Sequence, residues 1–264
     1  MIRRLVGVMG LWIIPVTVHA ASAQALYPID SPLGGPQSIY SKPLLKVLKS
    51  WPPKNLPELE KTAGEVKIQA FDTPDNDTYI GLEQFMIVKA PLSKVEAVLD
   101  DLENYPKIFE GLLKLTVSDR DKNRFLTHWE QNVPIPFIAN EKSEMAYLVD
   151  KSRPDRKVYR YSLKSGNYQK FDDGMIVIEA NGKKETRYTE FDFFDADWGI
   201  AKSFGSLKIW KDSVEGLYQS DLAVKFRSEH PEWSFKQVLD KSKDQAGDAP
   251  IKERLKVKTV FRVD

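Results

Sequence analysis

The side chains best suited to catalysis or metal binding are few in this sequence, and their spacing matches no common motif. The chain has no cysteine, so disulfides, thiolate ligands and cysteine nucleophiles are excluded. Neither His128 nor His230 has a second histidine at the spacing of a zinc site. Strand alternation places His128 away from its aromatic neighbours, as an exposed or structural residue. We therefore expect no metal ion and no cofactor.

Two acidic segments remain as candidates for acid–base or cation chemistry. Asp100–Glu103 brings three carboxylates to the end of an expected helix, and paired carboxylates serve as acid and base in many enzymes. Acids at a helix end are more commonly solvated, and we favour that interpretation. Asp192–Asp197 lacks the glycine and the terminal glutamate of a calcium loop. The sequence thus predicts no assembled nucleophile, base and orienting group.

The first 25 residues have the pattern of a cleavable export signal. Arg3 and Arg4 precede an apolar run from Leu5 to Val18, and small residues at A-x-A spacing follow. The run is shorter than the roughly 20 residues that a membrane span needs, although an uncleaved anchor is the alternative. We predict a signal peptide at 1–25, cut after residue 23 or 25, and a protein located outside the cytoplasm, in the periplasm.

Composition and charge restrict the class of partner. The chain is 42% hydrophobic and 29% charged, as globular proteins are. Removal of residues 1–25 takes away two arginines and changes the formal net charge from +1 to −1. A nearly neutral chain gives no electrostatic reason to expect a nucleic-acid partner. About 240 remaining residues allow one large domain, or one ordinary domain with extensions.

The pattern along the chain predicts a sheet preceded by an irregular arm. Residues 26–64 contain seven prolines and are interpreted as an N-terminal arm, with a linker as the alternative. Alternating segments then follow, with a hairpin turn at Asn181–Gly182, and the sequential strands favour an antiparallel meander. The expected strands are Val66–Ala70, Tyr79–Lys89, Leu113–Asp119, Arg124–Val133, Lys142–Lys151, Lys157–Lys164, Met175–Ala180 and Lys183–Phe194.

Helical periodicity appears in three places. Ser93 is the expected N-cap of a first helix, which Tyr105-Pro106 interrupts. Apolar residues three or four apart predict a long amphipathic helix over Lys202–Arg227, and a second helix is expected at Glu232–Ser242. The alternating residues of Leu255–Val263 predict a terminal strand that joins the sheet edge near Val66.

Two sequence motifs resemble those of the START-like, or SRPBCC, superfamily of polyketide cyclase and lipid-transport type. V-K-A-P-L-S-K-V at 88–95, followed by D-D-L-E-N-Y-P at 100–106, is similar to the family's opening strand, proline turn and acidic helix end. P-F-I-A-N-E at 136–141 is similar to the segment before its fourth strand. The resemblance covers about residues 78–230. It implies an α+β helix-grip fold at 65–230, a curved antiparallel sheet of about seven strands around a long C-terminal helix, with a helix and strand extension at 231–264.

The helix-grip fold implies a gap between sheet and helix, which apolar side chains turn into a pocket for an apolar ligand. Strand alternation supplies candidates for its lining, although each could equally belong to an ordinary packed core. These candidates are Phe125, Trp129, Met145, Tyr147, Tyr159, Tyr161, Phe191, Phe193, Trp210 and Val214.

Three functions are consistent with the sequence. We favour a non-enzymatic protein that binds or carries a hydrophobic, lipid-like molecule outside the cytoplasm, with any membrane contact being transient. The second is a cyclase- or hydrolase-type enzyme that acts on an apolar substrate through Tyr159, Tyr161, Arg160 or His128. The third is an interaction module whose proline-rich arm and basic terminal strand dock a protein partner that the sequence does not identify.

Overall fold

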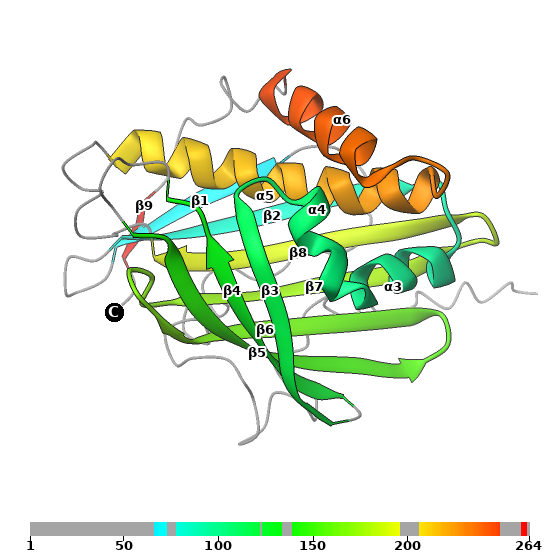
Figure 1. The fold of residues 1–264 in the computed structure, drawn as a ribbon, viewed down its shortest axis with the longest axis horizontal. Helices are drawn as coiled ribbons and strands as arrows, with labels where there is room; N and C mark the ends of the chain where they lie inside the picture. The colour runs from blue at the N-terminus through cyan, green and yellow to red at the C-terminus, as the bar shows by residue number, and fades with distance from the viewer. Residues whose placement is uncertain are drawn as a thin grey trace, which may run out of the picture.

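The computed structural model describes residues 66–72, 78–121, 123–133, 139–195, 206–248 and 260–262. The predicted signal peptide at 1–25 and proline-rich arm at 26–64 lie outside these residues, as do the first three residues of the P-F-I-A-N-E motif. The described strands form one curved sheet, and a long helix lies across one of its faces (Figure 1). Within the described residues no helix is long and apolar enough to cross a membrane.

The sheet has nine strands in the order β3-β4-β5-β6-β7-β8-β2-β1-β9. The seven strands from β2 to β8 form a continuous antiparallel set, as expected. β1 adds antiparallel to β2, and β9 adds parallel to β1 through the pair Ala70 and Val260. The terminal strand joins the first strand at the sheet edge, as predicted, but it pairs with Ala70–Asp72 and not near Val66. The strands are β1 (Val66–Asp72), β2 (Thr78–Val88), β3 (Leu112–Asp121), β4 (Arg124–Gln131), β5 (Glu141–Arg153), β6 (Arg156–Gly166), β7 (Asp172–Asn181), β8 (Glu185–Asp195) and β9 (Val260–Arg262).

Turn chemistry fixes the hairpin between β7 and β8. Asn181 pairs with Glu185 at the ends of the two strands, and the chain turns through residues 182–184. Gly182 has φ +74°, a conformation that glycine adopts without the steric penalty of a side chain. The predicted Asn-Gly turn is confirmed. It sets the register of β8 against β7, and this register places the acidic residues of β8 that are described below.

The helices lie on the concave side of the sheet. α3 (Leu92–Asp100), η2 (Leu102–Asn104) and α4 (Tyr105–Ile108) connect β2 to β3, and α5 (Ser206–Glu229) is followed by α6 (Phe235–Asp248). From Ser206 on, α5 coincides with the helix predicted over Lys202–Arg227, and it ends two residues later than expected. α3 lies beside α5, and α4 contacts α6 (Figure 1).

One local prediction at the first helix is wrong. α3 begins at Leu92, one residue before Ser93, and the cap position is occupied by Pro91 with φ −64° and ψ 152°. Proline supplies this extended geometry from its own ring. No side-chain hydrogen bond caps the helix, so Ser93 lies in the first turn as an exposed residue.

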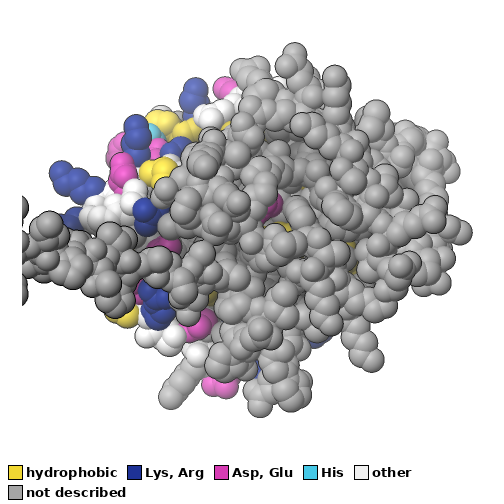
Figure 2. All heavy atoms as spheres, turned by 180° about the vertical axis from the view of Figure 1, so that it is seen from behind, with side chains coloured by type: hydrophobic (Ala, Val, Ile, Leu, Met, Phe, Trp, Pro, Cys, Tyr) yellow, Lys and Arg dark blue, Asp and Glu magenta, His cyan; other side chains and the backbone are white. Residues whose placement is uncertain are grey.

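Two apolar clusters hold the helices on the sheet. One joins α3 and η2 to the sheet through residues such as Val88, Leu99 and Tyr188. The other joins α5 and α6 to β2 through residues such as Leu82 and Leu222. The acidic and basic side chains visible in Figure 2 are interspersed at one end of the molecule. The described part of this face therefore shows no single-sign patch of the kind that binds nucleic acid.

Candidate functional site

A cavity of about 320 Å³ lies between the sheet and α5. Strands β4 to β8 form one wall, the segment from α3 to the start of β3 forms a second, and α5 closes it through Leu217, Ser220, Asp221 and Val224. The volume falls at the lower end of the range for small-molecule sites. Its aromatic lining residues are Tyr105, Phe109, Phe125, Trp129, Tyr147, Tyr159, Tyr161, Tyr188 and Phe194.

One row of cross-strand neighbours runs along the sheet wall of the cavity. Phe125 pairs with Tyr147, Tyr147 with Tyr161, Tyr161 with Gly174, and Gly174 with Asp192. Directly paired residues point to the same face of a sheet, so all five belong to the cavity side. The rings of Phe125 and Tyr147 stack at 4.9 Å with an interplanar angle of 6°, and the rings of Tyr147 and Tyr161 are 5.7 Å apart. Three aromatic rings therefore lead directly to an acid.

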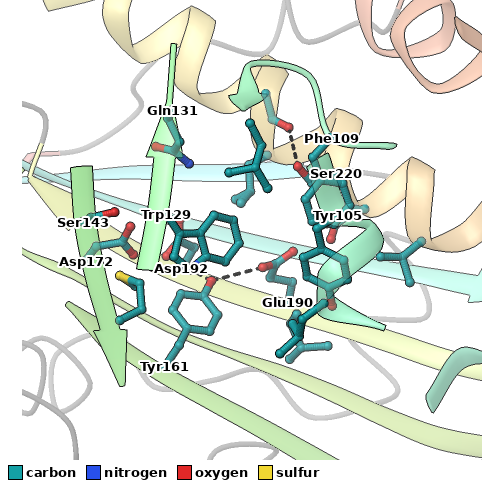
Figure 3. A pocket seen from close by; sticks show the side chains of 18 of the residues that line it. Tyr105, Phe109, Trp129, Gln131, Ser143, Tyr161, Asp172, Glu190, Asp192 and Ser220 are labelled. Carbon is teal, nitrogen blue, oxygen red and sulfur yellow. Dashed lines mark hydrogen bonds between the residues drawn. The ribbon is translucent and has the colours of Figure 1, made fainter. Parts of the chain in front are cut away.

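Four carboxyl groups gather at the end of this row. Glu190 and Asp192 come from β8, Asp172 comes from β7, and Asp221 reaches in from α5. The Tyr161 hydroxyl lies 3.1 Å from Glu190 Oε1 and 3.2 Å from Asp192 Oδ1 (Figure 3). A phenol has one proton to donate, so Tyr161 serves one of these two acceptors at a time.

Tyr188 makes the equivalent contact on the helix side. Its hydroxyl lies 2.7 Å from Asp221 Oδ1 and 3.4 Å from Glu190 Oε2. Burial raises the pKa of both Tyr161 and Tyr188 above the ordinary value, and the nearby carboxylates raise each pKa further. Both phenols therefore stay protonated and act as hydrogen-bond donors to the acids.

The acids themselves form two neighbouring pairs, Asp172 with Asp192 and Glu190 with Asp221, in which each carboxyl group affects the pKa of the other. Burial raises the pKa of Asp192 to about 7 and that of Asp221 to about 6. The pKa values of Asp172 and Glu190 rise well above the ordinary range, first through burial and then through repulsion by the neighbouring acid. Each pair therefore retains a proton toward neutral pH, because two close carboxylates cannot both ionise cheaply.

No basic side chain balances this charge from within the cavity wall. Among the described lining residues there is no lysine, arginine or histidine. In the same part of the chain no three His, Cys, Asp or Glu side chains converge on a point where a metal ion would sit. The cavity thus combines an aromatic wall with an anionic end, and it can bind a small molecule or exchange a proton with it.

The predicted acidic segment at the end of α3 has divided roles. Asp101 is exposed and accepts hydrogen bonds from Asn104, as a solvated acid does. Asp100 is only partly exposed. It accepts a hydrogen bond of 3.1 Å from the Tyr159 hydroxyl and forms an ion pair with Lys151. Burial and the charge of Asp100 raise the pKa of Tyr159. Asp100 therefore fixes the ring of a cavity residue, which the solvated interpretation did not anticipate.

Six of the ten predicted lining residues do line the cavity. These are Phe125, Trp129, Met145, Tyr147, Tyr159 and Tyr161. Their contact with a ligand stays a prediction. Trp210 and Val214 lie in α5, but their side chains are outside the described part of the structure, and the helix residues described at the cavity begin at Gly216.

The prediction for Phe191 and Phe193 is wrong. Both are buried, with 4% and 0% of their surface exposed, but on the face of β8 opposite the cavity, where Phe193 contacts the ring of Phe171 at 5.2 Å. β8 is covered on both faces, so hydrophobicity did not identify the cavity side. The residues that line the cavity are Tyr188, Glu190, Asp192 and Phe194.

The other residues proposed for catalysis lie away from the cavity. His128 is on the outer face of β4, half exposed, beside Ser118 and Glu144. Arg160 is buried at 4% exposure but points to the opposite face of β6 from Tyr159 and Tyr161. The acids at the cavity that the sequence analysis missed are Glu190, Asp172 and Asp221. The only available sign was the alternation of acids with phenylalanines along β8.

The arrangement defines a helix-grip fold with an internal cavity between the sheet and α5. No protein-family model matches the sequence, and no curated protein matches it. Solved structures of START-type proteins resemble the chain. The Zhui aromatase/cyclase from Streptomyces sp. R1128 is 15% identical over 63% of this chain and 95% of its own, with a TM-score of 0.47. A START superfamily protein from Mycobacterium smegmatis is 12% identical over 57% and 98%, with a TM-score of 0.44. A STAR-related lipid transfer protein from Xanthomonas axonopodis is 12% identical over 48% and 76%, with a TM-score of 0.38.

Proposed function

We propose that the protein binds a small, largely apolar molecule in the cavity between the sheet and α5, and holds or carries it outside the cytoplasm. The observation that carries the proposal is the cavity itself, about 320 Å³ with aromatic rings from four strands around it. A well-packed core leaves few voids larger than a water molecule. A space of this size, reached by several tyrosine hydroxyls, fits an apolar ligand with a few polar groups.

Ligand binding is tested with protein purified without detergent. We expect solvent extraction followed by mass spectrometry to release a bound molecule, and the neutral probe N-phenyl-1-naphthylamine to bind and to be displaced by that molecule. Ser220→Trp places a large ring into the cavity from α5 and should abolish probe binding. Lys236→Trp adds the same ring on the exposed side of α6, where Lys236 pairs with Asp240, and should leave binding unchanged. Absence of both extracted ligand and probe binding would contradict the proposal.

The location outside the cytoplasm is supported by the sequence pattern of residues 1–25, which predicts an export signal. Cleavage after residue 23 or 25 gives a chain that starts at Gln24 or Leu26. N-terminal sequencing of the protein recovered from the periplasmic fraction should find one of these two residues. An intact Met1 in a membrane fraction would favour the uncleaved anchor instead.

A second function, acid–base catalysis on the bound molecule, is favoured by the two proton-sharing carboxyl pairs at the cavity. A group with a pKa of about 7, such as Asp192, can both take and return a proton near neutral pH. The extracted ligand should then gain deuterium at carbon when incubated in D₂O with the wild-type protein, and should gain none with Asp192→Asn. If the ligand gains no deuterium with either protein, catalysis is contradicted and ligand binding alone remains as the proposed function.

A further inference from the structure

The anionic end of the cavity restricts the charge of the ligand, on the assumption that the proposed ligand binding is correct. With pKa values of about 7 and about 6, Asp192 and Asp221 carry negative charge near neutral pH. These charges are buried: Asp221 is 1% exposed, and Glu190 and Asp192 are each 5% exposed. A buried charge without a partner costs several kcal/mol. The described lining residues supply no cation to offset it.

Some hydrogen-bonding capacity also remains unused at this end. Tyr161 and Tyr188 each have one proton to share between two acceptors. Asp221 Oδ2 and Asp172 Oδ1 are buried and receive no hydrogen bond from an N–H or hydroxyl donor. Asp172 and Asp221 both line the cavity. A ligand that brings further hydrogen-bond donors would therefore satisfy the acceptor oxygens of these acids.

A metal ion fits this geometry poorly. No three carboxylate, imidazole or thiol groups among the described residues surround one point, and the acids instead pair with each other and with phenols. A neutral alcohol would supply one hydrogen bond but no charge. An ammonium group supplies up to three donors and a positive charge. The rings of Tyr105, Trp129 and Tyr147 line the same cavity and can attract a cation through their faces.

We propose that the cavity selects an apolar molecule that carries a protonated amine, with the ammonium group placed among Glu190, Asp192 and Asp221 and the apolar body against the aromatic wall of β4 and β5. The aromatic row Phe125, Tyr147 and Tyr161 leads from the outer wall to the acids. An elongated ligand would therefore lie along this row with its amine at the α5 end.

Three probes of one shape test the choice of charge. The probes 4-phenylbutylamine, 4-phenylbutan-1-ol and 4-phenylbutanoate differ only in a cationic, neutral or anionic end group, and their dissociation constants are measured by titration calorimetry at pH 7. We expect the amine to bind at least about tenfold more tightly than the alcohol, which corresponds to about 1.4 kcal/mol, and the carboxylate to bind most weakly.

Variants separate the acids from the aromatic wall. Glu190→Gln with Asp221→Asn keeps the shape and removes charge, and should weaken the amine at least about tenfold while leaving the alcohol nearly unchanged. Phe125→Leu trims the wall and should weaken both probes alike. Circular dichroism checks that each variant is folded. If the double variant does not fold, the binding of the three probes to the wild-type protein still tests which ligand charge the cavity prefers.

The outcomes distinguish this inference from the proposed function. Failure of all three probes and of N-phenyl-1-naphthylamine would contradict ligand binding itself. Equal binding of the amine and the alcohol would keep the proposed function and overturn the inference, as would tighter binding of the carboxylate. A melting temperature raised by MgCl₂ or CaCl₂ in the wild type, but not in the double variant, would identify a metal site and also overturn it.

Discussion

The ring of Tyr161 lies directly over the Cα of Gly174 on the neighbouring strand. The two residues are cross-strand partners on the cavity face, and a Cβ atom at position 174 would overlap with Cζ and the hydroxyl oxygen of Tyr161. The missing side chain lets the tyrosine lie flat across β7 and reach Glu190 and Asp192 on β8. A glycine in a strand interior often marks such a close approach.

We expect Gly174→Ala to displace the Tyr161 ring and to destabilise the protein by about 2–4 kcal/mol, through overpacking and the loss of the hydrogen bonds to the acids. Chemical denaturation measures the change. Gly216→Ala is the matched control, because a Cβ on α5 at that position meets no atom within 4 Å and alanine favours a helix. In the combination with Tyr161→Leu, the cost of Gly174→Ala should largely disappear. Equal costs in both backgrounds would contradict the steric explanation.

Removal of one hydroxyl tests how the acids are held. Tyr161→Phe leaves Glu190 and Asp192 without their shared donor, and we expect a loss of about 1–3 kcal/mol in the free energy of unfolding. Tyr147→Phe is the control: its ring lies 5.7 Å from that of Tyr161, and its hydroxyl makes no hydrogen bond within the described residues. The control should stay within about 0.5 kcal/mol of the wild type. Similar losses for both variants would show that the hydroxyl contacts contribute little.

Much of the fold followed from local pattern. Period-two alternation identified the strands, and the Asn181-Gly182 turn fixed a hairpin, because both signals depend on neighbouring residues alone. Alternation also placed Tyr159 and Tyr161 on one face, and the cavity lies on that face. The same rule failed on β8, where both faces are buried and the more apolar residues, Phe191 and Phe193, point away from the cavity.

The acid cluster was beyond local pattern. Asp172, Glu190 and Asp221 come from two strands and a helix, and only the folded chain brings them together. Sequence reasoning treats a lone acid as a surface residue because burying an unpaired charge is costly. That cost is reduced here by sharing protons between acids and by phenol donors, which are properties of the three-dimensional contact. The need for a glycine at position 174 could not be predicted from the sequence either, because it depends on the ring of Tyr161 from another strand.

The raised pKa values predict how stability depends on pH. Asp192 and Asp221 have pKa values of about 7 and about 6 in the folded protein, above the roughly 3.9 of an unfolded aspartate. The folded state therefore binds more protons between about pH 4 and pH 7. The stability from these groups is fully present below their unfolded pKa and is lost as pH rises through the folded pKa.

We expect the free energy of unfolding of the wild type to fall from pH 5 to pH 8 by about 1 kcal/mol or more, as one pKa unit corresponds to about 1.4 kcal/mol. Asp192→Asn should flatten this slope. Asp155→Asn should not, because Asp155 pairs with Arg153 at the surface and its lowered pKa keeps it ionised throughout the range. Urea denaturation at four pH values measures the slopes. A wild-type stability that rises toward pH 8 would be inconsistent with buried, proton-sharing acids.

A buried glutamine connects the cavity's second wall to α5. Gln219 is 1% exposed. Its Nε2 donates to Ile108 O at 2.8 Å and to Ser242 Oγ at 2.7 Å, and its Oε1 accepts from the Glu110 N–H at 2.9 Å. One side chain thus satisfies the backbone at the end of α4 and ties it to both C-terminal helices. Unsatisfied buried backbone groups are costly.

We therefore expect Gln219→Leu to destabilise the protein by about 2–4 kcal/mol, because the Ile108 carbonyl and the Glu110 N–H lose their hydrogen-bond partner. Amide hydrogen exchange at Glu110 should become faster, because the turn beside the cavity loses its tie to α5. Ser242→Ala removes only one of the three contacts and should cost about 1 kcal/mol without faster exchange at Glu110. Unchanged exchange at that amide in Gln219→Leu would show that packing alone, rather than Gln219, holds α4 in place over the cavity.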